Sequence, residues 1–170
     1  NYGNNTTGTE QQMTIEGTSA VKATLAIIRN SNDANDGGII LGKTRGTSVN
    51  ANTAVQEGDD LGALNFVGAD GTSLQFGAAI HAQVETGVGN DDMPASLVFS
   101  TNGGSTSTSE RMIVDFAGRV GIGTMTPGSF NSSSDNLVIR SSGDTGLTLS
   151  GSSGGSCAIS FSNAVDTHVS

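Results

Sequence analysis

One segment of this chain matches a pattern that holds phosphate groups in nucleotide-binding proteins. Residues 37–44 read Gly-Gly-Ile-Ile-Leu-Gly-Lys-Thr, which fits the phosphate-loop pattern G-x-x-x-x-G-K-[ST]. That chemistry needs a hydrophobic strand before the loop and a helix after it, so that backbone amides hold the phosphates. Here a polar turn precedes the match and poor helix formers follow it. We therefore predict a core β-strand over residues 39–43 instead of a nucleotide site.

Three acidic turns could hold a cation through carboxylate and amide oxygens. Residues 32–37 resemble a calcium loop, but Ala34 stands where a ligand is needed and no Glu follows at the twelfth position. Asp59-Asp60 and residues 90–92 (Asn-Asp-Asp) are the other two. We interpret all three as ordinary solvated turns and predict no metal site and no cofactor. A metal on a symmetry axis stays open as an alternative without assigned residues.

Hydrolysis of a polysaccharide would need two carboxylates about 5–10 Å apart in a groove. The candidates, which the sequence alone cannot pair, are Glu16, Glu57, Glu85 and Asp115. The chain has no Trp and one Tyr, so platforms on which a sugar ring could stack are scarce. His81 and His168 have no Ser or Cys motif beside them, and we predict structural roles for both. We assign no catalytic residue and do not expect an enzyme.

The composition favours short strands and turns over a deep core within one chain. Gly accounts for 25 of the 170 residues, hydrophobic residues for 34% and charged residues for 14%. Domains of this kind often complete their core by oligomerising. The net charge of −9 argues against nucleic acid as a partner, and no apolar run is long enough for membrane insertion. Cys157, the single cysteine, excludes an internal disulfide and is expected to be half-buried in a strand.

Alternating apolar residues predict an all-β fold of short antiparallel strands and hairpins. Turn-forming residues separate the strands, most clearly at 30–37 and 68–71. We expect residues 96–100 to pair with 112–116 across the loop 101–109. The complete set of expected strands is 13–15, 25–29, 39–43, 63–67, 73–80 continuing through 79–85, 96–100 and 112–116.

Residues 110–127 read as two short strands around a tight turn. Asp115 and Gly118 suit the first and fourth positions of a type I turn, with Gly118 at positive φ as a bulge. Gly121 and Gly123 would share one side of the following strand and leave a smooth backbone surface there. We expect another chain to approach closely at this surface.

The chain also repeats itself weakly. Leu25-Ala-Ile27 resembles Leu147-Thr-Leu149, and residues 38–42 resemble 158–162, so the offset is about 120 residues. We interpret residues 1–9 as an N-terminal linker and 10–128 as one β-rich unit. A linker over 129–135 and the start of a second, similar β unit over 136–170 would follow. Because the chain begins at Asn1 without an initiator Met, we expect a piece of a longer protein.

The order of the short motifs resembles the repeat regions of bacteriophage tail-fibre proteins, especially those followed by a self-cleaving intramolecular chaperone domain. The resemblance covers residues 10–127 well and 136–170 weakly. Its strongest part is Glu110-Arg-Met-Ile-Val-Asp115 followed by Val120-Gly-Ile-Gly-Thr124. The chaperone domain and its catalytic residues are not in this sequence, so no peptidase role carries over. The segments that carry the order are 43–50, 55–62, 64–66, 69–72, 79–82, 93–101, 110–115 and 120–124.

The resemblance implies an intertwined homotrimeric β fibre segment, extracellular in the virion, joined to other tail or baseplate proteins and used for host attachment. A host glycan or protein receptor would contact loops, of which 50–60, 86–92 and 101–109 are the candidates. Two alternatives stay open: a capsid-decorating or cell-surface structural fibre without a receptor role, and a tailspike-like glycan depolymerase. The apolar side chains expected near the trimer axis are Leu25, Ile27, Ile39, Leu41, Met112, Val114, Val120 and Ile122.

Overall fold

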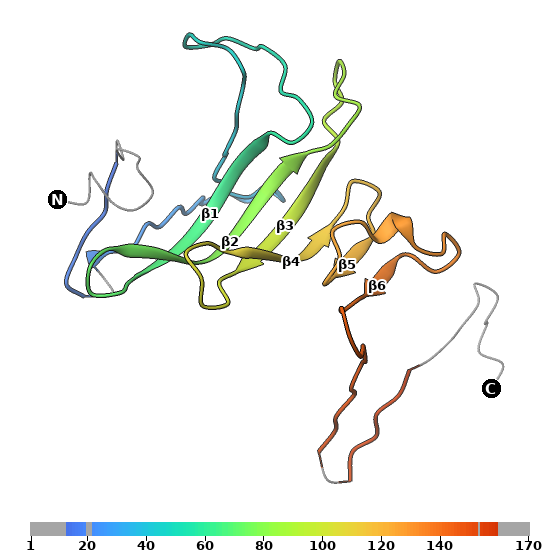
Figure 1. Ribbon diagram of the computed structural model, residues 1–170. Helices are drawn as coiled ribbons and strands as arrows, with labels where there is room; N and C mark the ends of the chain where they lie inside the picture. Colours follow the sequence, from blue (N-terminus) through green and yellow to red (C-terminus); the bar gives the residue numbers. More distant parts are fainter. Residues whose placement is uncertain (1–12, 20–21, 153, 160–170) are drawn as a thin grey trace. The chain divides into compact units, whose positions relative to one another are not determined.

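The chain is all-β, as the sequence predicts. A computed structural model describes residues 13–19, 22–152 and 154–159, and it divides into two compact units, residues 1–140 and 141–170. One six-stranded sheet lies in the first unit (Figure 1). Its strands are β1 (Asp60–Ala69), β2 (Leu74–Val84), β3 (Ala95–Thr101), β4 (Ser109–Val114), β5 (Val120–Ile122) and β6 (Leu137–Ile139).

Strands that follow one another in sequence lie side by side in the sheet. The first five are antiparallel neighbours, and β6 returns parallel to β5 after a crossover that contains the short 3-10 turn η3 (Pro127–Ser129). The predicted strands at 63–67, 73–85 and 96–100 are confirmed. The strand predicted at 112–116 begins earlier and ends at Val114, and its pairing with β3 is confirmed by the register Leu97↔Val114.

Two tight turns have the geometry that their residues predict. In the β1–β2 turn, Asp70 N–H donates to Ser73 O at 3.0 Å, and Gly71 has φ +98°. In the β4–β5 turn, Gly118 N–H donates to Asp115 O at 2.9 Å, and Gly118 has φ +81°. Only glycine takes such a φ without strain, so these residues fix the register of the flanking strands.

One part of the small core, Val55 and Val84, lies where residues 55–59 meet the end of β2, and the other lies where the β5–β6 crossover folds over one face of the sheet. Val98 of β3 is 1% exposed and Ile113 of β4 is 5% exposed. Thr124, Pro127 and Asp135, all in the crossover, are buried as well. The crossover therefore covers only part of one sheet face.

The prediction that another chain approaches closely at Gly121 and Gly123 is wrong. A Cβ on Gly121 would meet Thr124 O, and a Cβ on Gly123 would meet Arg140 O, so the same chain makes both close approaches. Gly123 also lies beyond β5 and has φ +71°. These glycines let the crossover and the end of β6 pack tightly against β4 and β5.

The strands predicted at 13–15, 25–29 and 39–43 are not strands in this structure. The two segments 25–29 and 37–43 approach each other at Gly37, where a Cβ would lie 3.5 Å from Ile27 Cγ2 and 3.7 Å from Arg29 Cβ. Within the described residues, however, neither segment forms a β-ladder (Figure 1). Alternation predicts an extended backbone, but a strand also needs a hydrogen-bonding partner. We call residues 22–43 the N-terminal arm.

The described residues of the second unit, 141–152 and 154–159, contain no strand and include bends at 142–143 and a turn at 154. Cys157 is exposed and outside any strand, so the prediction of a half-buried strand position is wrong. β6 falls in the range expected to open a second β unit and lies in the sheet of the first. His168 and the linker predicted at 1–9 lie outside the described residues.

Candidate assembly surface and polar groove

The register of the strands sorts the side chains of the sheet onto two faces. Pairs such as Leu64↔Ile80, Phe99↔Met112 and Val114↔Val120 lie on one face, because directly opposed residues point the same way. We call this the apolar face. It carries Leu64, Phe66, Ile80, Leu97, Phe99, Met112, Val114, Val120, Ile122, Leu137 and Ile139.

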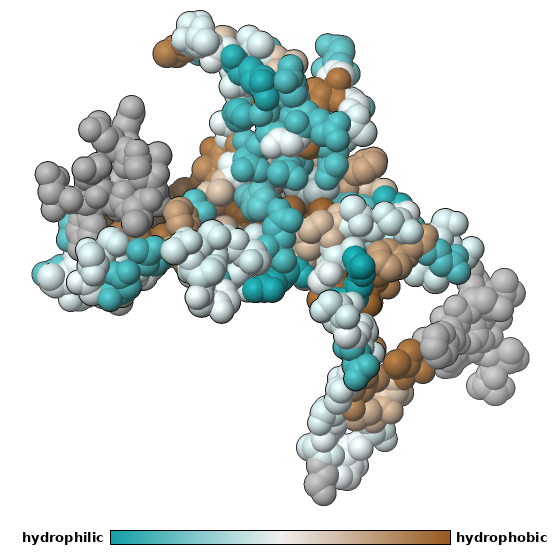
Figure 2. Space-filling view, viewed as in Figure 1, coloured by the Kyte–Doolittle hydropathy of each residue, from teal (hydrophilic) through white to brown (hydrophobic). Residues whose placement is uncertain are grey.

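The apolar face is exposed in the single chain. Phe66 is 55% exposed, Leu64 52% and Leu137 56%, at opposite edges of the sheet. Apolar side chains reach the surface in each unit (Figure 2). A contiguous apolar surface across a whole sheet marks an interaction site in a protein that is otherwise polar. Four residues expected at a trimer axis, Met112, Val114, Val120 and Ile122, do share this face.

One end of the N-terminal arm lies against this face at β1. Ile39 and Leu41 line a hollow with Leu64, Ile80 and Leu97. A Cβ on Gly62 would lie 2.5 Å from Leu41 Cβ, so glycine is needed for this approach. Ile28 and Ile40 remain 77% and 96% exposed. The arm therefore covers a corner of the sheet and leaves most of its own apolar side chains uncovered.

A buried carboxylate fastens the arm to β1. Asp59 is 7% exposed and accepts hydrogen bonds from Arg45 Nε at 2.7 Å and Nη2 at 2.8 Å. Lys43 Nζ lies 2.6 Å from Asp59 Oδ1, the oxygen that also accepts from Arg45 Nη2. The Arg45 guanidinium, then Lys43 and the Gln56 N–H, hold the pKa of Asp59 well below its usual range. The interpretation of Asp59 as an ordinary solvated turn residue is therefore wrong.

The segment that matches the phosphate loop is part of this arm. Residues 37–43 are extended, and Lys43, the residue that would meet a phosphate, pairs with Asp59. The described residues that follow, 44–50, form bends and a turn and no helix. The segment thus lacks the strand–loop–helix geometry of a nucleotide site.

A second buried charge cluster closes the other end of the sheet. Arg119 Nε donates to Asp115 Oδ2 at 2.7 Å, and its Nη1 lies 3.3 Å from Asp135 Oδ2. The second oxygen of Asp115 accepts from the N–H groups of Ala117 and Arg119. Burial raises the pKa of Asp115, but the hydrogen bonds from Arg119 and Ala117 outweigh it and lower that pKa. The cluster ties the β4–β5 turn to the crossover.

The structure brings two of the four candidate catalytic carboxylates to one hollow. Glu85 and Asp115 both line it, whereas Glu16 and Glu57 do not. Glycoside hydrolysis needs one carboxyl group that is protonated and a second that is free to act on the sugar. Asp115 is ionised with both oxygens occupied, and Glu85 accepts a hydrogen bond from Ser96 Oγ at 2.5 Å. Both carboxylates are thus engaged in hydrogen bonds within the chain.

The two remaining acidic turns, at residues 32–37 and 90–92, do not point several oxygen atoms toward a common position where a metal ion could bind. In residues 32–37, Asp33 binds the Arg29 guanidinium at 2.6 and 2.7 Å, and this pairing lowers the pKa of Asp33. The turn at 90–92 is exposed and closed by the Gly89↔Asp92 bridge. Across the part of the chain that the structure describes, no group of three or more His, Cys, Asp or Glu is placed to hold a metal.

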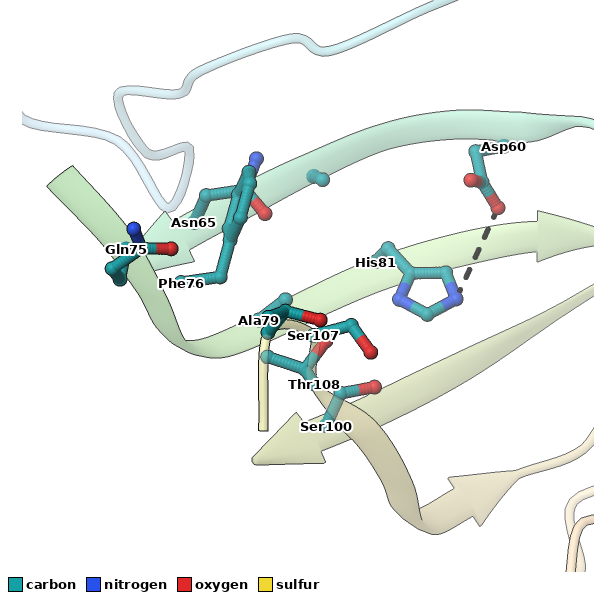
Figure 3. A pocket seen from close by; sticks show the side chains of 11 residues that line it. Asp60, Asn65, Gln75, Phe76, Ala79, His81, Ser100, Ser107 and Thr108 are labelled. Atoms are coloured by element: carbon teal, nitrogen blue, oxygen red, sulfur yellow. Dashed lines mark ion pairs between the residues drawn. The ribbon is translucent and has the colours of Figure 1, made fainter. Parts of the chain in front are cut away.

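The face opposite the apolar face contains a groove of about 710 Å³ (Figure 3). We call it the polar groove after the polar side chains along it, although most of its lining surface is apolar. The pairs Ala63↔His81 and Asn65↔Ala79 form its floor, and the β3–β4 loop forms one wall. His81 Nε2 lies 3.9 Å from Asp60 Oδ1. The side chains that the groove presents are Asp60, Asn65, Gln75, Phe76, His81, Ser100 and those of residues 106–108.

The sequence anticipates this groove only in part. His81 lies in a strand as expected and has a side chain 15% exposed. Two of the three candidate receptor loops, 50–60 and 101–109, contribute residues to the groove, and 86–92 contributes none. Sequence analysis missed Asn65, Gln75 and Phe76. The alternation in 63–67, which sets Asn65 opposite to Leu64 and Phe66, is the signal that could have found this polar face.

The comparisons with known proteins show a likeness in fold. The structure is similar to the carboxy-terminal domain of the bacteriophage T5 L-shaped tail fibre, with a TM-score of 0.59 and 15% sequence identity. The alignment covers 82% of this chain and 59% of that one, so the chain spans less than two thirds of its neighbour. No family model matches the sequence, and no curated protein matches it significantly.

The described residues contain no helix with the length and hydropathy needed to cross a membrane.

Proposed function

We propose that this chain is a structural segment of a viral tail fibre, in which three copies assemble with their apolar faces toward a common axis. The exposed apolar face carries this proposal, and the fold it shares with a tail-fibre domain supports it. Removing apolar surface from water contributes about 25 cal/mol per Å², so a face of this width favours assembly.

The N-terminal arm supports assembly through its backbone. Its residues 25–29 and 37–43 are extended, and ladder hydrogen bonds are absent from them within the described chain. Extended backbone of this kind pairs readily with another strand. In the proposed trimer, neighbouring copies provide these strands, which explains why residues with strand-like alternation remain unpaired in one chain.

In this proposal the fibre is extracellular in the virion, joins other tail or baseplate proteins, and helps attachment to the host. The role is mechanical and adhesive rather than enzymatic, because the two carboxylates that share a hollow are engaged in structural hydrogen bonds. Host attachment uses the surface that the assembly leaves facing solvent.

The mass of the protein in solution tests the proposal. Light scattering is expected to give about three times the chain mass of 17.0 kDa. The variant Phe66→Asp places a charge on the apolar face and is expected to lower the mass toward one chain. Phe116→Asp is the matched control, since Phe116 is 53% exposed but lies in the β4–β5 turn.

A folded wild-type monomer would contradict the proposal. So would a trimer that Phe66→Asp and Phe116→Asp leave equally intact, because the apolar face would then not be the interface. Circular dichroism of each variant confirms that a change in mass is not caused by unfolding.

A further inference from the structure

We infer that the polar groove on the face opposite the apolar face is a binding site for a neutral saccharide. The inference deepens the proposed function and rests on it in one respect: assembly through the apolar face leaves the groove open to solvent. The alternation of the strands places the groove and the apolar face on opposite sides of β1, β2 and β3.

The groove gathers several side chains that make no hydrogen bond within the described chain, although His81 and Asp60 form a long ion pair at 3.9 Å. Among the described residues, no hydrogen bond joins the side chains of Asn65, His81 or Asp60 to another protein group. The hydroxyls of residues 106–108 are likewise without a side-chain partner in the described chain. The groove thus offers a carboxylate acceptor, an amide that both donates and accepts, an imidazole and several hydroxyls.

This mixture of donors and acceptors fits a ligand rich in hydroxyl groups. Each hydroxyl donates one hydrogen bond and accepts others, so different hydroxyls of one ligand can bind Asp60 at one end of the groove and Asn65 at the other (Figure 3). Phe76 adds an aromatic side chain at the same groove, beside Asn65 (Figure 3). Sugar rings combine polar edges with apolar C–H faces, which pack on aromatic rings.

The charge and the backbone of the groove narrow the ligand class. Asp60 is a carboxylate, none of the described residues that line the groove is Lys or Arg, and the chain carries a net charge of −9, so an anionic ligand is disfavoured. The backbone of Ala63, Asn65 and Ala79 is paired in the sheet. Beside the groove, an extended peptide could add its backbone at the free edge of β1, the outer strand of the sheet, whereas a saccharide needs only the side chains of the floor.

Hydrogen bonds hold the loop wall in place before a ligand arrives. Asn102 Nδ2 donates to Phe76 O at 2.9 Å and to Ser105 O at 2.8 Å. Its Oδ1 accepts from the N–H groups of Gly104 and Ser105. Asn102 thus ties the β3–β4 loop to β2 on the groove side, and a groove of about 710 Å³ falls within the size range of small-ligand sites.

The test uses neutral linear hexasaccharides of glucose, galactose, mannose and N-acetylglucosamine, with an oligogalacturonate as the acidic comparison. Each sugar is titrated at millimolar concentration into the full chain and followed by nuclear magnetic resonance and calorimetry. At least one neutral sugar is expected to shift resonances of Asn65, Phe76 and His81 saturably, and the acidic one is not.

Two groove variants and a matched control locate the site. Asn65→Ala and His81→Ala are each expected to weaken binding about tenfold, as loss of a hydrogen-bonding partner does. Asn136→Ala is the control, because Asn136 is exposed just before β6 and away from the groove. Binding that survives both groove variants would overturn the inference, and so would the absence of any neutral-sugar shift.

The mass measurement is made on the same samples and separates the two proposals. A trimer that binds none of the sugars overturns the groove inference and leaves the fibre assembly standing. A monomer that binds a sugar through Asn65 and His81 overturns the assembly and leaves the groove as the ligand site.

Discussion

The sheet of residues 60–139 and the N-terminal arm are built from similar sequence and reach different structures. Both alternate apolar with small or polar residues, as in residues 25–29 and in 63–67. In the sheet, each strand finds its partner across a short turn or loop of the same chain. In the arm, the neighbouring segment lies close but forms no ladder within the described residues. The alternation of apolar with small or polar residues therefore favours an extended backbone, and a hydrogen-bonding partner decides whether that backbone becomes a strand.

The largest expected effect comes from the small core of the sheet. Ile113 is 5% exposed, and the variant Ile113→Ala is expected to lower the free energy of unfolding of the protein by about 2–5 kcal/mol. Val49→Ala, at a position 91% exposed, is expected to change it by less than about 0.5 kcal/mol. Denaturant titration at one fixed protein concentration measures both. Similar losses in the two variants would show that the core does not lie where the sheet places it.

The second largest expected effect on stability comes from replacing Gly123, and Gly38 serves as its comparison. Gly123→Ala forces a residue with a Cβ to φ +71° against Arg140 O, and we expect a loss of about 1–3 kcal/mol. Gly38→Ala, in the N-terminal arm, meets nothing within 4 Å and is expected to change stability by less than about 0.5 kcal/mol. Thermal melting compares them. Equal melting temperatures would contradict the close packing of the β5–β6 region.

A smaller effect, dependent on pH, is expected where the arm meets the sheet. The pKa of Asp59 is lowered in the folded state, so its contribution to stability is present above its ordinary pKa of about 4. The contribution is lost as the pH falls through the folded-state value. Asp59→Asn is therefore expected to destabilise the protein at pH 7, with the difference from the wild type shrinking below about pH 4.

Asp60→Asn is the neighbouring control, because the Asp60 side chain is 60% exposed and binds no Lys or Arg. Melting curves across pH measure the two variants. A difference between Asp59→Asn and wild type that persists unchanged in acid would show that the ion pairs with Lys43 and Arg45 are not its cause.

The smallest expected effect is a change in how strongly the backbone amides of the N-terminal arm are protected from hydrogen exchange. Amides of residues 25–29 and 37–43 are expected to exchange rapidly in the Phe66→Asp monomer and more slowly in the wild-type trimer, because only the trimer supplies strand partners. Hydrogen exchange followed by mass spectrometry measures this. Rapid exchange of the arm in a proven trimer would show that the arm is extended without pairing even after assembly.

Part of the candidate site was open to prediction. Asp115 and Gly118 indicated the β4–β5 turn because each residue type has a local preference that needs no distant partner. Met112, Val114, Val120 and Ile122 indicated an apolar face because alternation alone places them together. The groove was less accessible, since it joins Asn65, His81 and the β3–β4 loop across three strands, and only their register brings them together.

The sequence by itself determined the all-β class, the turns and the polar or apolar character of each strand face, because these follow from local backbone preference and a period of two residues. Only the tertiary structure decided which extended segments are strands, which carboxylates are buried, and which chain fills the space at Gly121 and Gly123. Those features depend on contacts between residues far apart in sequence. Asp59 shows the difference. Its neighbours in sequence predict a solvated turn, but it is buried because Lys43 at the end of the arm and Arg45 just after it reach it.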